Sequence, residues 1–159
     1  TRVEVTLTFD VDRNYEAAAR QTEQEERIDL TGVRVLLVED NDLNAEIAQT
    51  MLEDEGAQVT TAANGKQAVE RFQSSPPGTF DAILMDVMMP LLDGYEATRA
   101  IRALDRPDAA AIPIFAMTAN AFEEDRKKAF ECGMNGHIVK PIDRRSISKV
   151  LDQIFKEAK

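Results

Sequence analysis

The chain has 159 residues, 43% of them apolar and 30% charged, which suits one soluble domain with a real core and an additional short segment. Its formal net charge of −10 argues against electrostatic binding to nucleic acid or to an anionic membrane surface. The single cysteine, Cys132, excludes an internal disulfide framework and fits a reducing, cytoplasmic compartment.

The first nine residues alternate strictly, with Val3, Val5, Leu7 and Phe9 on one face, which predicts a half-buried strand. Residues 10–31 are polar and acid-rich, and we interpret them as a linker. The strand therefore has no local partner. It is either the last strand of a preceding domain or an additional edge strand of the main sheet. Because the chain begins with threonine, we expect it to be a fragment of a longer protein.

From residue 32 onward, short apolar runs alternate with segments whose apolar residues recur at helical spacing. The apolar runs predict five strands, over residues 33–38, 57–62, 80–86, 112–118 and 135–139. The intervening segments predict helices over residues 43–52, 64–72, 95–104, 123–132 and 143–156. Residues 32–159 are thus predicted to form one domain in which strands and helices alternate.

Five alternating strands and helices imply an α/β fold, with an all-parallel sheet and helices on both faces. Neither the dinucleotide motif GxGxxG nor the P-loop motif GxxxxGK[ST] is present, so both nucleotide-binding alternatives lack their phosphate site. The best fit is a doubly wound five-stranded sheet of flavodoxin-like order 2-1-3-4-5.

Polar residues follow the strands of this sheet at the edge where ligands collect in such folds. Glu39 and Asp40 follow the first strand of the domain, and Asp86 ends the third strand, its expected neighbour. Thr118 and Lys140 end the fourth and fifth strands. Asp86 alone could be a helix cap or a solvated acid. The convergence of five such residues at one sheet edge instead favours a chemical site.

Three carboxylates in one crevice repel each other unless a cation lies between them. Oxygen ligands with open positions suit Mg²⁺, which retains waters and binds phosphate oxygens. With the metal bound, Asp86 can attack a phosphorus centre and form an aspartyl-phosphate. The metal, the Lys140 ammonium and the Thr118 hydroxyl would then share the charge of the phosphoryl oxygens.

Five short motifs carry these residues: Val38-Glu39-Asp40-Asn41, Met85-Asp86-Val87-Met88-Met89-Pro90, Asp93-Gly94, Met117-Thr118-Ala119 and Lys140-Pro141. Together they resemble the receiver domain of two-component response regulators, over roughly Gly32 to Phe155. The local sequence, including Ala119-Asn120-Ala121, is most similar to receivers fused to hybrid sensor histidine kinases. On this resemblance the parent chain is a hybrid kinase, residues 1–9 are the final strand of its ATP-binding domain, and residues 10–31 are the tether.

The resemblance implies a role for each acidic residue of the site. Asp86 is the phosphoacceptor, and Glu39 and Asp40 hold Mg²⁺ together with it. The backbone carbonyl of Val87 completes the protein ligands of the metal.

The resemblance also assigns the residues that respond to phosphorylation. Thr118 is the switch hydroxyl that moves toward the phosphoryl group, and Lys140 contacts that group. The Lys140-Pro141 peptide bond is commonly cis in the family. Three residues before the lysine the family has an aromatic residue, where this chain has His137. His137 either adds a proton-dependent charge to the switch or is a surface residue without a special role.

These assignments describe a phosphoacceptor module of a two-component phosphorelay rather than a conventional enzyme. The donor would be a phosphohistidine on a histidine kinase dimerisation and phosphotransfer domain, and a histidine phosphotransfer protein is a candidate next acceptor. A homodimer is a further candidate assembly. We expect the fragment to be cytoplasmic and to contact neither nucleic acid nor membrane, even where the parent kinase is membrane-anchored.

Two other functions are compatible with parts of this pattern. A degenerate receiver would bind partners without being phosphorylated, but the complete set of five residues argues against it. A haloacid-dehalogenase-type phosphatase also uses an aspartate nucleophile and Mg²⁺. It needs a second aspartate two residues later, where this chain has Met88.

Overall fold

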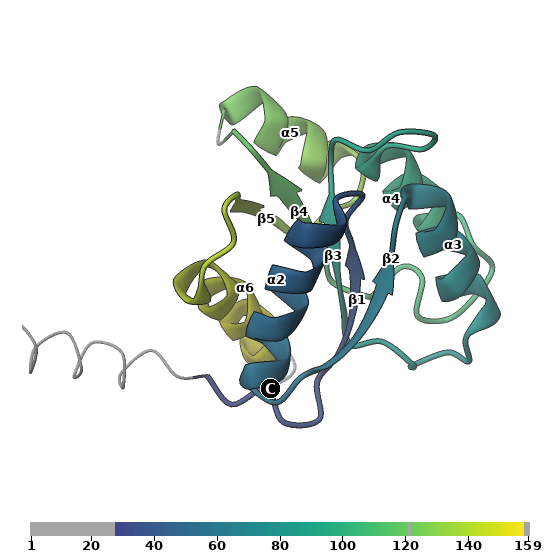
Figure 1. The fold of residues 1–159 in the computed structure, drawn as a ribbon. Coiled ribbons are helices and arrows are strands. Elements are labelled where there is room, and N and C mark those ends of the chain that lie inside the picture. Colours follow the sequence, from purple (N-terminus) through teal and green to yellow (C-terminus); the bar gives the residue numbers. More distant parts are fainter. Residues whose placement is uncertain (1–27, 121, 158–159) are drawn as a thin grey trace, which may run out of the picture.

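The computed structural model describes residues 28–120 and 122–157 of the chain (Figure 1). The predicted strand over residues 1–9 and the predicted linker up to residue 27 lie outside these described residues. The linker prediction extended to residue 31, and the last part of that segment belongs to the fold. Leu30 is fully buried, and its backbone N–H donates to the carbonyl of Glu55 at 2.7 Å.

Five short parallel strands form the described sheet: β1 (Arg34–Val38), β2 (Gln58–Ala62), β3 (Ala82–Asp86), β4 (Ile114–Thr118) and β5 (Gly136–Val139). Their order is β2-β1-β3-β4-β5. The predicted α/β, doubly wound, flavodoxin-like order 2-1-3-4-5 is therefore confirmed. In this order β1 and β3 are neighbours, and they leave the sheet in opposite directions through their crossovers.

Helices follow the strands in alternation: α2 (Asp42–Asp54), α3 (Gly65–Ser74), α4 (Gly94–Arg102), α5 (Glu123–Glu131) and α6 (Arg144–Glu157). They cover both faces of the sheet (Figure 1). Residues of α3, α4 and α5 pack with one core cluster, whereas α2 and α6 contribute to the other. Each predicted helix is thus present, with ends that differ by a few residues from the predicted bounds.

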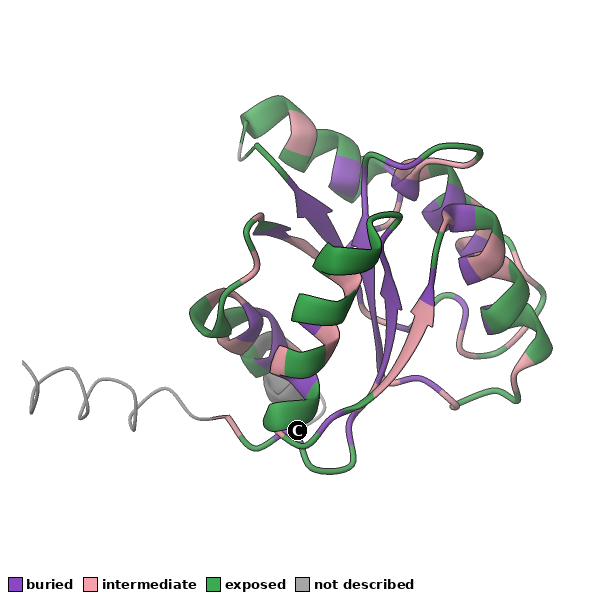
Figure 2. Ribbon diagram, viewed as in Figure 1, coloured by how far each residue is buried: buried purple, intermediate pink, exposed green. Residues whose placement is uncertain are grey.

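The central strands are buried on both faces because helices cover both sides of the sheet. All five residues of β3 and all five of β4 are buried. Side chains alternate between the clusters, so that Leu36 and Val38 of β1 belong to one, and Val35 and Leu37 to the other. Figure 2 shows this pattern: the central strands are buried, the edge strand β2 is largely half-buried, and the outer faces of the helices are exposed.

Polar caps start the helices directly beyond the strand ends. Asn41 accepts the N–H of Asn44 at 3.0 Å at the start of α2, and Asp93 forms a reciprocal capping box with Glu96 at the start of α4. Gly94 follows this cap, where a Cβ atom would lie 2.2 Å from the carbonyl oxygen of Asp86. Only glycine therefore allows α4 to begin against the end of β3.

Among the helices of the described residues, none combines the length and the apolar character that crossing a bilayer requires.

Candidate functional site

Three acidic side chains meet beyond the carboxyl ends of β1 and β3. Glu39 and Asp86 are buried, with 4% and 3% of their surface exposed, whereas Asp40 is exposed. Each offers a carboxylate oxygen, and these oxygens all lie within 4.8 Å of one another. The structure thus brings together the three carboxylates that the sequence predicts at one site.

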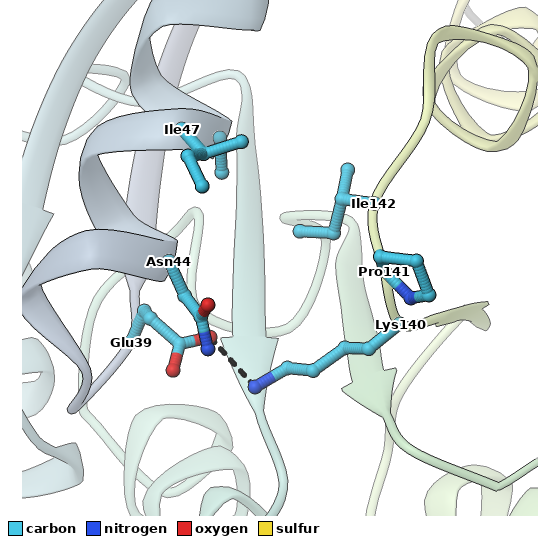
Figure 3. A pocket seen from close by; sticks show the side chains of 7 residues that line it. Glu39, Asn44, Ile47, Lys140, Pro141 and Ile142 are labelled. Atoms are coloured by element: carbon cyan, nitrogen blue, oxygen red, sulfur yellow. Dashed lines mark ion pairs between the residues drawn. The ribbon is translucent and has the colours of Figure 1, made fainter.

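Lys140 reaches this acidic group from the end of β5. Its Nζ atom lies 2.7 Å from Oε2 of Glu39 and 3.0 Å from Oδ2 of Asp86. Figure 3 shows the lysine extended toward Glu39 across the site. One ammonium group faces three carboxylates, so the site keeps an excess of negative charge that a divalent cation would neutralise.

Burial and charge shift the ionisation of both Asp86 and Lys140. Burial, reinforced by the nearby Glu39 carboxylate, raises the pKa of Asp86 to about 6, although the hydrogen bond from Lys140 opposes this rise. Burial alone would lower the pKa of Lys140, but its hydrogen bonds to Glu39 and Asp86 raise that pKa overall. The lysine is therefore charged near neutral pH, whereas the aspartate titrates closer to neutrality than an ordinary carboxyl.

Backbone groups hold the two buried carboxylates in place. The N–H of Met88 donates to Oδ1 of Asp86 at 3.1 Å, and the N–H of Asn41 donates to Oε1 of Glu39 at 3.3 Å. Together with Lys140, these donors orient both acids from several directions. The roles of these backbone groups could not be predicted from the sequence, because a backbone donor leaves no residue-type signal.

Thr118 ends β4, next to the strand that carries Asp86. Its hydroxyl donates to the carbonyl of Asn120 at 3.0 Å and accepts the N–H of Asn120 at 3.2 Å. The predicted switch residue thus lies at the expected strand end, with its hydroxyl held by the loop that follows β4. The partner Asn120 was predicted only as part of a motif.

His137 lies on β5, three residues before Lys140, and does not join the carboxylate group. It is half-buried and lines a groove with Arg126 of α5. Burial and the Arg126 charge lower its pKa, so the imidazole is neutral at physiological pH. The peptide bond between Lys140 and Pro141 is cis, as the resemblance to receiver domains implied.

The carbonyl of Val87, predicted as a metal ligand, accepts the N–H of Gly94 at 3.1 Å. This bond directs the carbonyl toward the start of α4 and occupies one of its two lone pairs. The second lone pair remains available, so the role of this carbonyl as a metal ligand stays a prediction.

An apolar pocket of about 270 Å³ adjoins Glu39 and Lys140 (Figure 3). Its walls come from α2 and from the segment after β5: Asn44, Ile47, Ala48, Pro141 and Ile142. The sequence did not single out these residues as a site. The sequence signal that could have indicated the pocket is the pair of apolar residues Leu43 and Ile47 at helical spacing. In the structure these side chains of α2 are 64% and 46% exposed.

Several other acidic and sulfur-containing residues of the domain have structural roles. Asp81 directly precedes β3, at the opposite end of that strand from Asp86, and pairs with Arg34, whose Nη2 lies 2.9 Å from Oδ1 of Asp81. Asp93 caps α4, and Cys132 is buried in the core. Met85 and Met117 are fully buried, whereas Met88 beside the site is 77% exposed.

Comparison with known proteins identifies relatives of this fold and site. The family model described as the response regulator receiver domain matches residues 35–152. Hybrid signal transduction histidine kinase I of Dictyostelium discoideum is 39% identical over 126 residues, which cover 77% of this chain and 7% of that protein. Sensor protein GacS of Pseudomonas syringae pv. syringae is 40% identical over 119 residues, covering 74% of this chain and 13% of that protein. The chain thus spans only a small part of the curated relatives that it matches.

Solved structures show the same likeness. The receiver domain of sensor histidine kinase PA1611 from Pseudomonas aeruginosa PAO1, which has a magnesium ion coordinated in its active site cleft, is 40% identical. It superposes with a TM-score of 0.70, covering 79% of this chain and 99% of that chain. Chemotaxis response regulator CheY4 of Vibrio cholerae is 30% identical, with a TM-score of 0.70 over 78% of this chain and 99% of that chain.

Proposed function

This chain belongs to the response regulator receiver family, and from that premise we propose that it accepts a phosphoryl group on Asp86 in a Mg²⁺-dependent step. One observation carries the proposal. Asp86 is a buried carboxylate that lies beside Glu39 and Asp40 and is paired with Lys140 at 3.0 Å. Such a site combines a nucleophile with the charges that a phosphoryl group requires.

The donor set fits Mg²⁺. The three carboxylates supply oxygen ligands close enough to share one ion, and the exposed Asp40 leaves the site open to water and to phosphate oxygens. Val87 would contribute through the second lone pair of its carbonyl. The magnesium ion in the cleft of the PA1611 receiver domain supports this assignment. When bound, the ion supplies positive charge for the phosphoryl oxygens.

In the transfer step, an oxygen of Asp86 forms a bond to phosphorus as the P–N bond of a donor phosphohistidine breaks. The imidazole leaves with the electron pair of that bond. Lys140, which is charged and already 3.0 Å from Asp86, is placed to contact the incoming phosphoryl oxygens. Glu39 remains oriented by the N–H of Asn41.

Thr118 would act as the switch. Its hydroxyl must leave the two hydrogen bonds with Asn120 in order to reach a phosphoryl group on the neighbouring strand end. That exchange would change the loop between β4 and α5 and so report phosphorylation to the surface. His137, neutral and half-buried on β5, lies on the same side of the fold and is proposed to take part in this response.

The partners that we propose for this chain are supported by its similarity to histidine kinases, and not by a feature of the chain alone. We propose that the parent protein is a hybrid histidine kinase. Its receiver domain would lie in the cytoplasm, whether or not the kinase is anchored in a membrane. The donor would be the dimerisation and phosphotransfer domain of a histidine kinase, and the next acceptor a histidine phosphotransfer protein. Both would present a phosphorylated or acceptor histidine to Asp86, on the side of the site where Asp40 is exposed.

The decisive experiment treats the protein with acetyl phosphate, with and without Mg²⁺, and measures intact mass. We expect an added phosphoryl group only with Mg²⁺, and no adduct in Asp86→Asn. The matched control is Asp81→Asn, which removes another carboxylate from the same region but lies outside the site.

Other outcomes separate the rival functions. No adduct in the wild type, together with no response to beryllofluoride, would overturn the proposal in favour of a module that only binds partners. Rapid turnover of a small phosphate ester would instead support the phosphatase, although the exposed Met88 stands where that family needs its second aspartate.

A further inference from the structure

The pocket of about 270 Å³ between helix α2 and the segment after β5 adjoins the acidic site directly (Figure 3). Glu39 and Lys140 line the pocket and also belong to that site. The Nζ atom of Lys140 lies 3.0 Å from Oδ2 of Asp86. The pocket therefore begins where an incoming phosphoryl group would contact Lys140, although transfer of that group to Asp86 by itself gives the pocket no ligand.

Most walls of the pocket are apolar. Ile47 of α2 lies opposite Pro141 and Ile142 (Figure 3), and Ala48 completes this part of the lining. Ile47 keeps 46% of its surface exposed, so the described part of the fold leaves apolar surface uncovered here. The volume is just below that of pockets for drug-sized ligands, which is about 300–1,000 Å³. The pocket therefore suits a small apolar or aromatic ring.

Asn44 adds a neutral polar group to the charged end of the pocket. Its backbone N–H donates to the cap residue Asn41 at 3.0 Å, which fixes its place in the first turn of α2. Figure 3 shows its side chain directed toward Glu39 and the end of Lys140. Within the described part of the chain, the Asn44 carboxamide has no hydrogen-bond partner. Its oxygen and NH₂ group are therefore available to a ligand that enters the pocket.

We propose that this pocket binds the imidazole ring of the donor phosphohistidine, an inference that rests on the proposed phosphoryl transfer to Asp86. The ring packs against Ile47 and Pro141. The carboxamide oxygen of Asn44 accepts the N–H of the ring nitrogen that does not carry phosphorus. The phosphoryl group then lies on the side of Lys140, next to Asp86.

The polar end of the pocket favours the form of the ring that leaves most easily. As an oxygen of Asp86 bonds to phosphorus, the P–N bond breaks and its electron pair stays on the ring nitrogen. A ring that carries a proton on its other nitrogen leaves as neutral imidazole, whereas a ring without that proton leaves as an anion. A hydrogen bond to Asn44 holds this proton in place, and the nearby Glu39 carboxylate favours the cationic ring. Asn44 thereby selects a donor that has a ring N–H.

The first test compares two small donors in the presence of Mg²⁺, N-phosphoimidazole and acetyl phosphate, of which only the first has an imidazole ring. Intact mass gives the rate of phosphorylation with each donor, and the quantity of interest is the ratio of the two rates. We expect this ratio to fall about fivefold or more in Asn44→Ala, the effect of one hydrogen bond. The matched control is Gln49→Ala, which removes a carboxamide of the same helix that donates to Glu53 outside the pocket. Its ratio should stay within about twofold of the wild type.

Two results of this comparison would count against the proposal in different ways. Equal losses with both donors in Asn44→Ala would overturn it, since Asn44 would then act on Asp86 and its surroundings rather than on the ring. A wild type that accepts a phosphoryl group from neither donor would overturn the proposed function and, with it, the role of the ring.

A binding measurement tests the pocket without phosphoryl transfer and without Mg²⁺. Imidazole and 1-methylimidazole share one ring, but neutral 1-methylimidazole lacks the N–H. At about pH 8.5, where both rings are neutral, we expect imidazole to shift the amide resonances of Asn44, Ile47 and Ile142. It should bind about fivefold more tightly than 1-methylimidazole, and Asn44→Ala should abolish this difference. Shifts confined to other residues, or equal binding of the two rings to the wild type, would overturn the assignment of the pocket.

Discussion

The ionisation of Asp86 links the site directly to the stability of the protein. Burial beside Glu39 raises the pKa of Asp86 from 3.8 to about 6, so the folded protein favours the protonated form. Between these pH values the folded state binds more protons than the unfolded state. The free energy of unfolding should therefore fall as the pH rises from about 4 through 6. The acid lowers stability at the pH where it would act as a nucleophile.

Asp86→Asn removes the destabilising effect of an ionised, buried carboxylate while keeping a side chain of the same shape. We expect the variant to have a higher free energy of unfolding at pH 7.5, by about 1–3 kcal/mol, and to lose that advantage toward pH 4. Urea unfolding at several pH values measures the difference. An Asp86→Asn variant that is less stable than the wild type at pH 7.5 would contradict the argument.

Asp81 provides a control of the opposite sign. Burial alone would raise its pKa, but hydrogen bonds from Arg34 lower that pKa overall. A lowered pKa contributes stability above the unfolded value, and this contribution is lost as the pH falls through the folded value. Asp81→Asn should therefore destabilise the protein at pH 7.5. Both substitutions remove one negative charge, so opposite changes in the free energy of unfolding would show that the surroundings of each carboxylate decide the effect.

Lys140 is the only cation in contact with the buried carboxylates among the ion pairs of the described chain. Lys140→Met keeps much of the side-chain volume but leaves Glu39 and Asp86 facing each other without a cationic partner. We expect the free energy of unfolding to fall by about 3–5 kcal/mol at pH 7.5, and by less at pH 5, where Asp86 is protonated. Denaturant unfolding at both pH values tests this.

Lys66→Met is the matched control for that substitution. Lys66 is exposed and lies 4.0 Å from Glu70 on the same helix, an arrangement that contributes little in water. We expect a change below about 0.5 kcal/mol. Similar losses in both lysine variants would show that the buried site does not depend on Lys140.

At the scale of elements, the junction between β3 and α4 controls the position of the site. A Cβ atom on Gly94 would lie 2.2 Å from the carbonyl oxygen of Asp86 and 2.9 Å from Cα of Val87, both of them backbone atoms. Gly94→Ala must therefore displace the helix start or the strand end. We expect a loss of about 1–3 kcal/mol in stability, together with weaker Mg²⁺ binding, because Asp86 moves.

Gly32→Ala separates this steric effect from conformational strain. Gly32 has φ +84°, and a Cβ atom there would meet nothing within 4 Å. Its replacement should cost about 1–2 kcal/mol through the left-handed conformation alone, with Mg²⁺ binding unchanged. Calorimetric titration with Mg²⁺ and urea unfolding of both variants measure the two effects. Unchanged Mg²⁺ binding in Gly94→Ala would contradict the proposed coupling.

The elements were predictable because each leaves a pattern in the sequence. The apolar runs before Asp86 and Thr118 predict buried strands, and their polar ends predict the edge where the site forms. Contacts that join distant segments leave no such pattern. Arg102 donates to the carbonyls of Gly133 and Ala109, and the backbone of Leu30 joins the end of α2. A hydrogen bond to a backbone carbonyl, or a single buried leucine in a polar segment, produces no periodic pattern of residue types in the sequence.

The side-chain geometry of the site was predictable only in part. Strand order alone brings Glu39, Asp86 and Lys140 to one edge of the sheet, as the structure confirms. Rotamers and loop paths are set by local packing, so the hydrogen bonds of Thr118 with Asn120 and of the Val87 carbonyl with Gly94 could not be foreseen. The sequence therefore predicts which residues meet more reliably than how each side chain is oriented.

For the whole molecule, the excess of carboxylates makes folding and cation binding interdependent. The chain carries a net charge of −10, and three of its acidic groups meet at one site with a single lysine. Cations can stabilise such a protein in two ways. They screen the general repulsion between acidic groups, or they bind specifically where the folded state brings carboxylates together.

Specific binding makes a quantitative prediction. A ligand that binds only the folded state raises the free energy of unfolding by RT ln(1 + [L]/Kd), which is about 2.7 kcal/mol at a concentration of 100 Kd. For a domain of this size each kcal/mol raises Tm by about 3–6 °C. We therefore expect Tm to rise with Mg²⁺ concentration in the wild type, and much less in Asp40→Asn, which lacks the exposed ligand. KCl at matched ionic strength measures the screening contribution. If KCl raised Tm as much as MgCl₂ did, the carboxylates would interact with cations only through general screening, and the metal site would have no specific occupant.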